Sequence, residues 1–505
     1  MKTPFLLFAL IPSFLSAKDA LAFSRIFTDH MVLQRDQEIM IWGRADAGDA
    51  LTLRFGGQSK TTRADDKGRW QVKLDPLTAF STGQDLSASL SNSDETITLK
   101  NVVVGDVWLC SGQSNMHFQM KSTARAEEEI AGMDHPSIRF FTVKQQFGQQ
   151  ELEDVNGRWQ TLTPSTAPEC SAVACYFACA LQPEIGVPVG LVISSVGGTR
   201  IESWMRPETL AATGESKDLI EKWRAVDAAE FEKIGQIYSA FQYERDRTHP
   251  EAVRKARAEG KPLPPPPVAP KQRCHDAPSA LHHGMIAPIE DFRVRGFLWY
   301  QGESNSGRPA PYRKLLPAMI ADWRKTWGET LPFLFVQIAP HQSIHPTFRE
   351  AQHEIWQNTP HTGMAVTTDV GDLSNIHPTR KRPVGERLAT AALAIAYGKD
   401  IEASGPLFKE MQIQDDRATL SFTHVGRGLV TKKEPLGGFT IAAADGRFFP
   451  AEATISGDQI IVRSDKVAQV AAVRYNWSKN PTGLLFNKDG LPAPPFRTDR
   501  PTTQK

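Results

Sequence analysis

The amino-acid sequence predicts an α/β protein whose central parallel sheet is flanked by an all-β region at each end of the chain. In the middle of the chain, short apolar runs alternate with helical stretches, as in a parallel sheet covered by helices on both faces. Before and after that part, apolar side chains recur at every second position between turn residues, which is typical of antiparallel β-structure.

The two β regions are expected at residues 23–101 and 401–505. In the first, Leu51, Leu53 and Phe55 alternate with polar residues, and a turn follows at residues 66–68. This pattern predicts a small N-terminal β-sandwich domain. Alternation returns near the C-terminus with a hairpin signal at Asp445-Gly446, so we predict a second β domain there.

The α/β part is expected at residues 102–400. A charged helical stretch followed by the proline tract 262–270 predicts a surface insertion over about residues 207–278. The expected strands of the parallel sheet are the five apolar runs at residues 102–109, 189–196, 294–300, 333–338 and 364–368.

Composition and the N-terminus indicate where the protein works. The 505 residues carry 58 basic and 57 acidic side chains, so no basic excess favours a nucleic-acid partner. Lys2, the apolar run 5–14 and Ala20-Leu21-Ala22 predict a secretory signal over residues 1–22. No later run is apolar enough to span a bilayer, so we predict a periplasmic or secreted protein without a membrane segment.

The five cysteines predict no metal site. Cys175 and Cys179 lie one helical turn apart in an Ala-rich segment, and no histidine stands beside them at the spacing of a zinc site. We therefore expect small buried side chains there.

Polar residues follow four of the expected strands at the ends where an open parallel sheet binds its ligands. Ser114 follows the first run, Gly197-Gly198 the second, and residues 301–305 the third. Beyond the last run lie two aspartates and a histidine, namely Asp369, Asp372 and His377.

These residue types suit acyl transfer, which needs an activated hydroxyl, a base, an acid that orients the base, and donors for the oxyanion. Ser114 is the candidate nucleophile and His377 the candidate base. Asp372 or Asp369 would orient the imidazole. The candidate oxyanion donors are the N–H of Ser114, an N–H of Gly197-Gly198, and the side-chain amide of Gln301 or Asn305.

Three segments resemble the signature blocks of the sialate O-acetylesterase family, within the SGNH-hydrolase superfamily. They are VWLCSGQSNM at residues 107–116, WYQGESN at 299–305 and IHP at 376–378. Further segments, such as residues 281–288 and 490–499, extend the resemblance over nearly the whole chain after the predicted signal.

The resemblance implies a flavodoxin-like α/β/α hydrolase core that removes acetyl groups from carbohydrate hydroxyls without a metal or other cofactor. Carried over to this sequence, the nucleophile falls on Ser114 and the base on His377. The oxyanion donors fall on Ser114, Gly198 and Gln301.

The sequence departs from the family pattern at the acid. Relatives often keep an aspartate two or three residues before the histidine, where this chain has Asn375 and Ser374. We prefer Asp372 because it is nearer to His377, with Asp369 second, and a Ser–His dyad is the alternative.

Five further residues are expected to bind substrate. Asn115, Glu303 and Asn305 belong to the signature blocks, and Glu303 would either orient a loop or contact the sugar. Trp204 and Arg206 follow the glycine pair and are placed to touch a sugar ring.

The predicted function is a secreted serine esterase acting on acetylated carbohydrate, either plant cell-wall polysaccharide such as xyloglucan or xylan, or O-acetylated sialic acid. Two alternatives remain from the sequence. One is a non-catalytic glycan-binding protein, and the other is a serine hydrolase acting on another ester.

Overall fold

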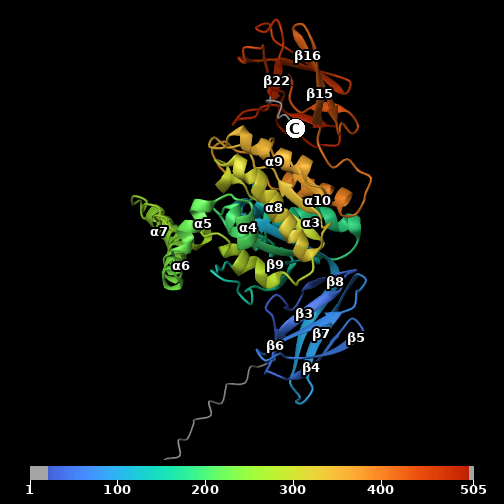
Figure 1. Ribbon diagram of the computed structural model, residues 1–505, viewed down its shortest axis with the longest axis vertical. Coiled ribbons are helices and arrows are strands. Elements are labelled where there is room, and N and C mark those ends of the chain that lie inside the picture. Colours follow the sequence, from blue (N-terminus) through green and yellow to red (C-terminus); the bar gives the residue numbers. More distant parts are fainter. Residues whose placement is uncertain (1–20, 500–505) are drawn as a thin grey trace, which may run out of the picture.

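The computed structural model describes residues 21–499 (Figure 1). The predicted signal, residues 1–22, lies outside these residues except for Leu21 and Ala22. Ala22 begins strand β1 (Ala22–Phe23), which pairs with β3 (Ile39–Arg44). Within residues 21–499, no helix has the length and apolar character needed to cross a membrane.

The five expected strands of the α/β part form one parallel sheet. They are β8 (Thr96–Gly112), β11 (Val189–Ser195), β12 (Gly296–Tyr300), β13 (Phe333–Val336) and β14 (Thr362–Ala365). Their order across the sheet is β11-β8-β12-β13-β14, and each neighbouring pair is parallel. This is the strand order of flavodoxin-like folds, so the predicted fold class is confirmed.

Two further strands extend the β11 edge. β9 (His135–Thr142) pairs parallel with β11, and β10 (Trp159–Leu162) pairs antiparallel with β9. The sequence analysis missed both, because their polar residues, such as Arg139, interrupt the apolar pattern.

Helices cover both faces of this sheet (Figure 1). One face packs against α3 (Ala172–Ile185) and α10 (Arg382–Ile395) in a core that includes Trp108 and Phe177. The other face packs against α8 (Pro309–Trp327) and α9 (Pro346–Asn358). Successive residues of each strand point to opposite faces, which explains why these strands are apolar throughout.

Strand β8 joins the parallel sheet to the N-terminal β region. Its first half pairs antiparallel with β7 (Phe80–Leu90), and its second half lies between β11 and β12. The boundary expected at residues 101–102 therefore falls inside one continuous strand. The rest of the N-terminal region is made of β2 (Val32–Gln34), β4 (Ala50–Phe55), β5 (Gln58–Arg63) and β6 (Arg69–Leu74), together with β1 and β3.

The C-terminal β region lies at the opposite end of the molecule (Figure 1). Its sheets surround a separate core. They are formed by β15 (Leu407–Gln414), β16 (Arg417–Thr423), β17 (Leu429–Thr431), β18 (Phe439–Ala442), β19 (Phe448–Pro450), β20 (Glu452–Ser456), β21 (Gln459–Arg463), β22 (Ala472–Tyr475), β23 (Leu485–Asn487) and β24 (Phe496–Arg497).

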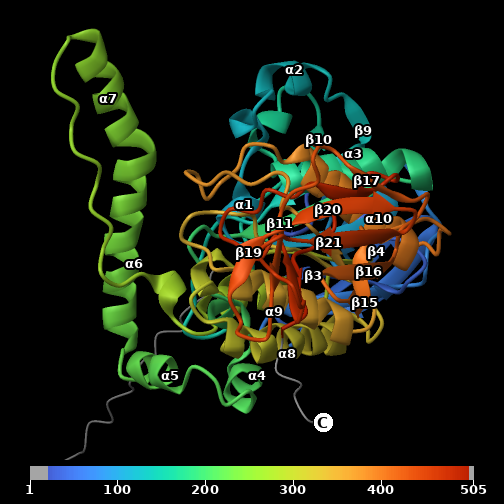
Figure 2. The same cartoon turned by 90° about the horizontal axis from the view of Figure 1, so that it is seen from above.

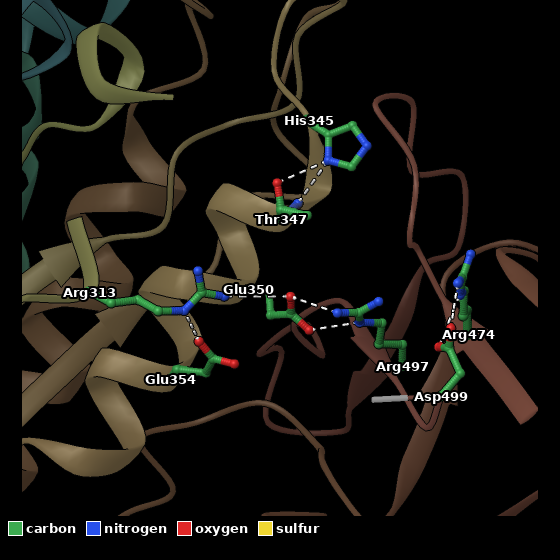
Figure 3. A network of polar contacts seen from close by, with 8 residues as sticks. All are labelled: Arg313, His345, Thr347, Glu350, Glu354, Arg474, Arg497 and Asp499. Carbon is green, nitrogen blue, oxygen red and sulfur yellow. Dashed lines mark hydrogen bonds and ion pairs between the residues drawn. The ribbon is translucent and has the colours of Figure 1, made fainter. Parts of the chain in front are cut away.

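Ion pairs attach this region to the α/β part (Figure 3). Arg497 of β24 donates from Nε to Glu350 Oε1 of α9 over 3.0 Å. Arg313 of α8 lies 3.7 Å from the other oxygen of Glu350. Arg349, fully buried, donates to the carbonyl of Ser478.

The expected insertion forms an arm of helices that projects from the α/β part (Figure 2). After α4 (Pro207–Ala212) and α5 (Lys217–Arg224), one long helical rod runs through α6 (Ala228–Tyr243), the π-helical turn Glu244–Thr248 and α7 (His249–Ala258). The proline-rich segment then returns the chain to the body (Figure 2). We call residues 228–273 the arm.

Candidate active site

Ser114 lies where β8 turns into the short helix α1 (Ser114–His117). The turn depends on Gly112, whose φ is +133° and whose hypothetical Cβ would lie 2.2 Å from the carbonyl oxygen of Tyr300. Only glycine adopts this conformation readily in so narrow a space. The Gln113 N–H then donates to that carbonyl over 2.9 Å, which holds Ser114 at the end of the sheet.

His377 reaches Ser114 from the loop between β14 and α10. Its Nε2 lies 2.7 Å from Ser114 Oγ, a hydrogen-bond distance suited to proton transfer. The backbone N–H of His377 donates to Asn375 Oδ1 over 2.9 Å. The structure thus brings together two residues that are 263 positions apart in sequence.

The two candidate acids are occupied elsewhere. Asp372 Oδ1 accepts hydrogen bonds from the N–H groups of Ser374 and Asn375, at 2.9 and 3.1 Å. Both oxygens of Asp369 pair with Arg387 at 2.7 Å. In the part of the chain that the structure describes, neither carboxylate bonds to His377. Asp372 therefore stabilises the turn that carries His377, because carboxylates readily accept from backbone N–H groups two residues on.

A buried polar network lies behind the serine and histidine. Asn115 Nδ2 donates to Glu303 Oε1 over 2.5 Å and to the carbonyl of Ile376 over 3.0 Å. Lys381 Nζ donates to the side-chain oxygen of Asn115. Asn115 thus connects three segments: its own segment next to Ser114, the turn that contains Glu303 and the loop that carries His377.

Lys381 is the residue of this network that the sequence analysis missed. Its side chain is buried, with Nζ 4.8 Å from the ring centre of Phe118 and 5.2 Å from that of Tyr300. It stands four residues after His377 at the start of α10. Nothing in the sequence distinguishes it from the neighbouring exposed cation Arg380.

Burial dominates the electrostatics of these groups. It lowers the pKa of Lys381 to about 7, against an opposing effect of Glu303, and it raises the pKa of Glu303. The pKa of His377 is lowered, first by burial and then by the positive charges of Lys381 and His341. The imidazole is therefore neutral at pH 7, the form that a general base requires.

The glycine pair after β11 lies beside the serine. A hypothetical Cβ on Gly197 would be 3.3 Å from Ser114 Cβ, and Gly198 has a φ of +75°. Ser114 begins α1, and the first N–H groups of a helix have no intrahelical acceptor. Ser114 and Gly198 both line the cavity described below.

Gln301 and Asn305 lie beneath this loop and are buried. Gln301 Nε2 donates to Asn305 Oδ1 over 2.7 Å and to the carbonyl of Thr199 over 3.1 Å. Asn305 also accepts from the N–H of Ile201 and donates to Glu202. Neither amide lines the cavity. The Gln301 NH₂ group and both polar atoms of Asn305 have internal partners that support the loop after Gly198, whereas Gln301 Oε1 is buried without a hydrogen-bond partner.

Trp204 and Arg206 are also placed away from the cavity. Trp204 is fully buried against Trp299, and its Nε1 donates to Thr199 Oγ1 over 3.0 Å. Arg206 forms ion pairs with Glu290 at 2.5 Å and Asp322 at 3.4 Å. The expectation that this pair touches a sugar is not supported, because the chain after Gly198 turns inward rather than along the surface.

A cavity of about 880 Å³ opens over Ser114 and His377. Residues near the strand ends and residues of the arm both line this cavity. From the sheet side, the cavity is lined by Gln113, Ser114, His117, Gln145, Gly197, Gly198, Glu303, Ser304, Ile376 and His377. From the arm, it is lined by Tyr238, Phe241, Gln242, Tyr243, Arg245, Asp246, Arg247, Ala269 and Arg273.

Among residues 21–499, no group of three or more His, Cys, Asp or Glu side chains could hold a metal ion.

The flavodoxin-like strand order and the contact between Ser114 and His377 are typical of a serine hydrolase. The family model described as carbohydrate esterase, sialic acid-specific acetylesterase, matches residues 104–254 and 279–394. The chain belongs to this family and is a carboxylic ester hydrolase of the carbohydrate acetylesterase type.

Relatives match over almost the full length. A carbohydrate acetylesterase from Xanthomonas citri, known from a crystal structure, is 34% identical, with 95% of this chain and 99% of that chain covered and a TM-score of 0.79. Sialate O-acetylesterase from Mus musculus is 28% identical over 538 residues, covering 95% of each chain. The Homo sapiens protein of the same name is 28% identical over 532 residues, covering 95% of this chain and 93% of that one. The predicted family is confirmed.

Proposed function

We propose that this protein uses Ser114 as a nucleophile to remove O-acetyl groups from carbohydrates through an acetyl-serine intermediate. The observation that carries the proposal is the 2.7 Å contact between Ser114 Oγ and His377 Nε2 at the floor of a large cavity. The neutral state of His377 supports the same role, because a protonated imidazole cannot accept the serine proton.

In the first half of the reaction, His377 Nε2 takes the hydroxyl proton as Ser114 Oγ bonds to the acetyl carbonyl carbon. The carbonyl electron pair becomes an oxyanion beside the N–H groups of Ser114 and Gly198. As the oxyanion collapses, the bond to the sugar oxygen breaks and His377 gives that oxygen its proton. In the second half, His377 takes a proton from water, the hydroxide attacks the acetyl-serine, and acetate leaves as Ser114 regains a proton.

We further propose that proton transfer relies on a Ser–His dyad, with Asp372 as a positioning residue. Asp372 and Asn375 fix the turn on which His377 stands. Asp369 is held by Arg387, so it is less suited than Asp372 to influence the imidazole.

The proposed substrate is an acetylated plant cell-wall polysaccharide, such as xyloglucan or xylan, or an O-acetylated sialic acid, met after export to the periplasm or beyond. The relatives are named as carbohydrate or sialate acetylesterases, which supports a carbohydrate ester as the substrate. Of three arginines that a sialate carboxylate could use, Arg206 is paired with Glu290 and Arg308 with Glu202. Arg200 is exposed and forms no ion pair among residues 21–499.

The test is acetate release by the Ser114→Ala variant. Removing the nucleophile should lower kcat by at least about a thousandfold, measured with acetylated xylan, acetylated xyloglucan and O-acetylated sialosides. The matched control is Ser304→Ala, because Ser304 lines the same cavity but does not contact His377. Unchanged acetate release by Ser114→Ala would exclude the proposed nucleophile.

A further inference from the structure

The base of the arm is fixed against the body of the protein at the edge of the active-site cavity. Gln242 Nε2 of α6 donates to Gln145 Oε1 over 2.9 Å. Tyr238, one helical turn earlier, is buried between Phe147 and His275, with ring centres at 6.0 and 4.7 Å. The last turn of α6 is therefore held in place at the edge of the cavity that Ser114 also lines.

Tyr243, the last residue of α6, lines the same cavity as Ser114 and His377. Its side chain is nevertheless 68% exposed. A large aromatic ring that is exposed to water does not gain the free energy that its burial would provide. Such a ring on a fixed element offers a flat apolar surface at little entropic cost when a ligand covers it.

The size of the cavity points to more than one bound sugar. Ligand sites that enclose whole small molecules measure about 300–1,000 Å³, and this cavity of about 880 Å³ greatly exceeds what an acetyl group needs. The space between the strand ends and the arm therefore has room for sugar rings as well as the acetyl group.

Two of the three arginines that the arm contributes to the cavity are paired with aspartates. Arg245 pairs with both oxygens of Asp246 at 2.6 and 2.7 Å, and Arg273 pairs with both oxygens of Asp276 at 2.9 and 2.8 Å. Arg245 and Arg273 are therefore balanced in charge, whereas Arg247, which also lines the cavity, forms no ion pair among residues 21–499.

We propose that the arm forms a subsite for a polysaccharide chain, in which Tyr243 stacks against a sugar ring beyond the acetylated residue. The inference rests on the proposed function and narrows its substrate to an oligosaccharide or polysaccharide. Tyr243 is a specificity-determining residue, and the chemistry stays with Ser114 and His377.

The test compares two kinds of ester with the Tyr243→Ala variant. With chemically acetylated xylan oligosaccharides of six sugars, kcat/KM should fall about tenfold, mainly through KM, as for other aromatic contacts in binding sites. With 4-nitrophenyl acetate, which has no sugar to stack, kcat/KM should stay within about twofold of the unmodified enzyme. Tyr243→Trp keeps a flat ring and should preserve activity on the oligosaccharide.

Ile237→Ala is the matched control. Ile237 lies on the same helix and is 49% exposed, but it is outside the cavity lining, so both activities should be unchanged. Equal activity of Tyr243→Ala and the unmodified enzyme on the six-sugar substrate would overturn the inference, as would an equal loss on both esters or no hydrolysis of the oligosaccharide. A lack of Ser114-dependent hydrolysis of 4-nitrophenyl acetate would instead contradict the proposed nucleophile.

Discussion

At the scale of single residues, the active site combines groups of very different exposure. Ser114 and His377 line an open cavity, whereas Asn115 and Lys381 are buried directly behind them. Lys381 Nζ contacts Asn115, and its charge lowers the pKa of His377. The positive charge of buried Lys381 therefore lowers the pKa of His377, the proposed base.

The Lys381→Met variant tests this electrostatic effect. A nearby positive charge disfavours the protonated imidazole, so removing Lys381 should raise the pKa of His377. In the proposed mechanism, activity depends on neutral His377 and is lost as the pH falls through its pKa. We expect the acid limb of the kcat/KM–pH profile to move to higher pH, measured with 4-nitrophenyl acetate.

Arg380→Met provides the control for this measurement. Arg380 is the adjacent cation, is exposed and donates to the carbonyl of Asp369, so its removal should leave the acid limb in place. If Lys381→Met lowers activity equally at every pH without moving the limb, Lys381 has only a structural role.

At the scale of elements, the sequence was most informative where a strand is buried on both faces. The apolar runs that became β8, β11, β12, β13 and β14 needed no tertiary information, because a strand covered by helices on both sides must be apolar throughout. The polar residues directly after them were likewise expected at one edge of the sheet. The amides of Gln301 and Asn305 followed the same rule and yet point into the protein, because local turns decide side-chain direction.

Gly112 shows how one turn controls the site. In Gly112→Ala, the new Cβ would meet the carbonyl of Tyr300 at a residue with positive φ. Overpacking and backbone strain together should lower the free energy of unfolding by about 2–4 kcal/mol, measured by denaturant unfolding, and displace Ser114 enough to reduce kcat.

Gly132→Ala is the comparison for that variant. Gly132 ends helix α2 (Ala126–Ala131) with a φ of −90°, and the nearest heavy atom to a hypothetical Cβ is 3.8 Å away. Its substitution should change stability by no more than about 0.5 kcal/mol. Equal unfolding midpoints for the two alanine variants would refute the steric argument.

At the scale of the whole molecule, the two β regions are joined to the α/β part in different ways. The N-terminal region shares strand β8 with the central sheet. The C-terminal region has its own core and is attached by side chains, among which Glu350 is buried between Arg497 and Arg313 (Figure 3). Its attachment should therefore be the more sensitive to a single substitution.

Glu350→Gln keeps the side-chain shape but removes the negative charge between two arginines. Breaking a buried ion pair leaves charge without compensation, so we expect a loss of about 1–3 kcal/mol in stability. Denaturant unfolding and faster proteolytic release of the C-terminal region would report it.

Glu452→Gln is the control within the C-terminal region. Glu452 pairs with Arg463 at the surface, with side chains 75% and 58% exposed, and such pairs contribute about 0–1 kcal/mol. The same proteolysis rate in both variants would show that Glu350 does not hold the region in place.

The sequence by itself determined the α/β class, the five parallel strands, the family, and the identities of the serine and histidine that meet. These follow from buried strands and from short segments whose residue types are set by local geometry. Only the tertiary structure decided that the aspartates have other partners, that Lys381 is buried, and that the arm borders the cavity. The physical reason is that burial, charge pairing and the closing of a cavity depend on residues far apart in the chain, which no local pattern records.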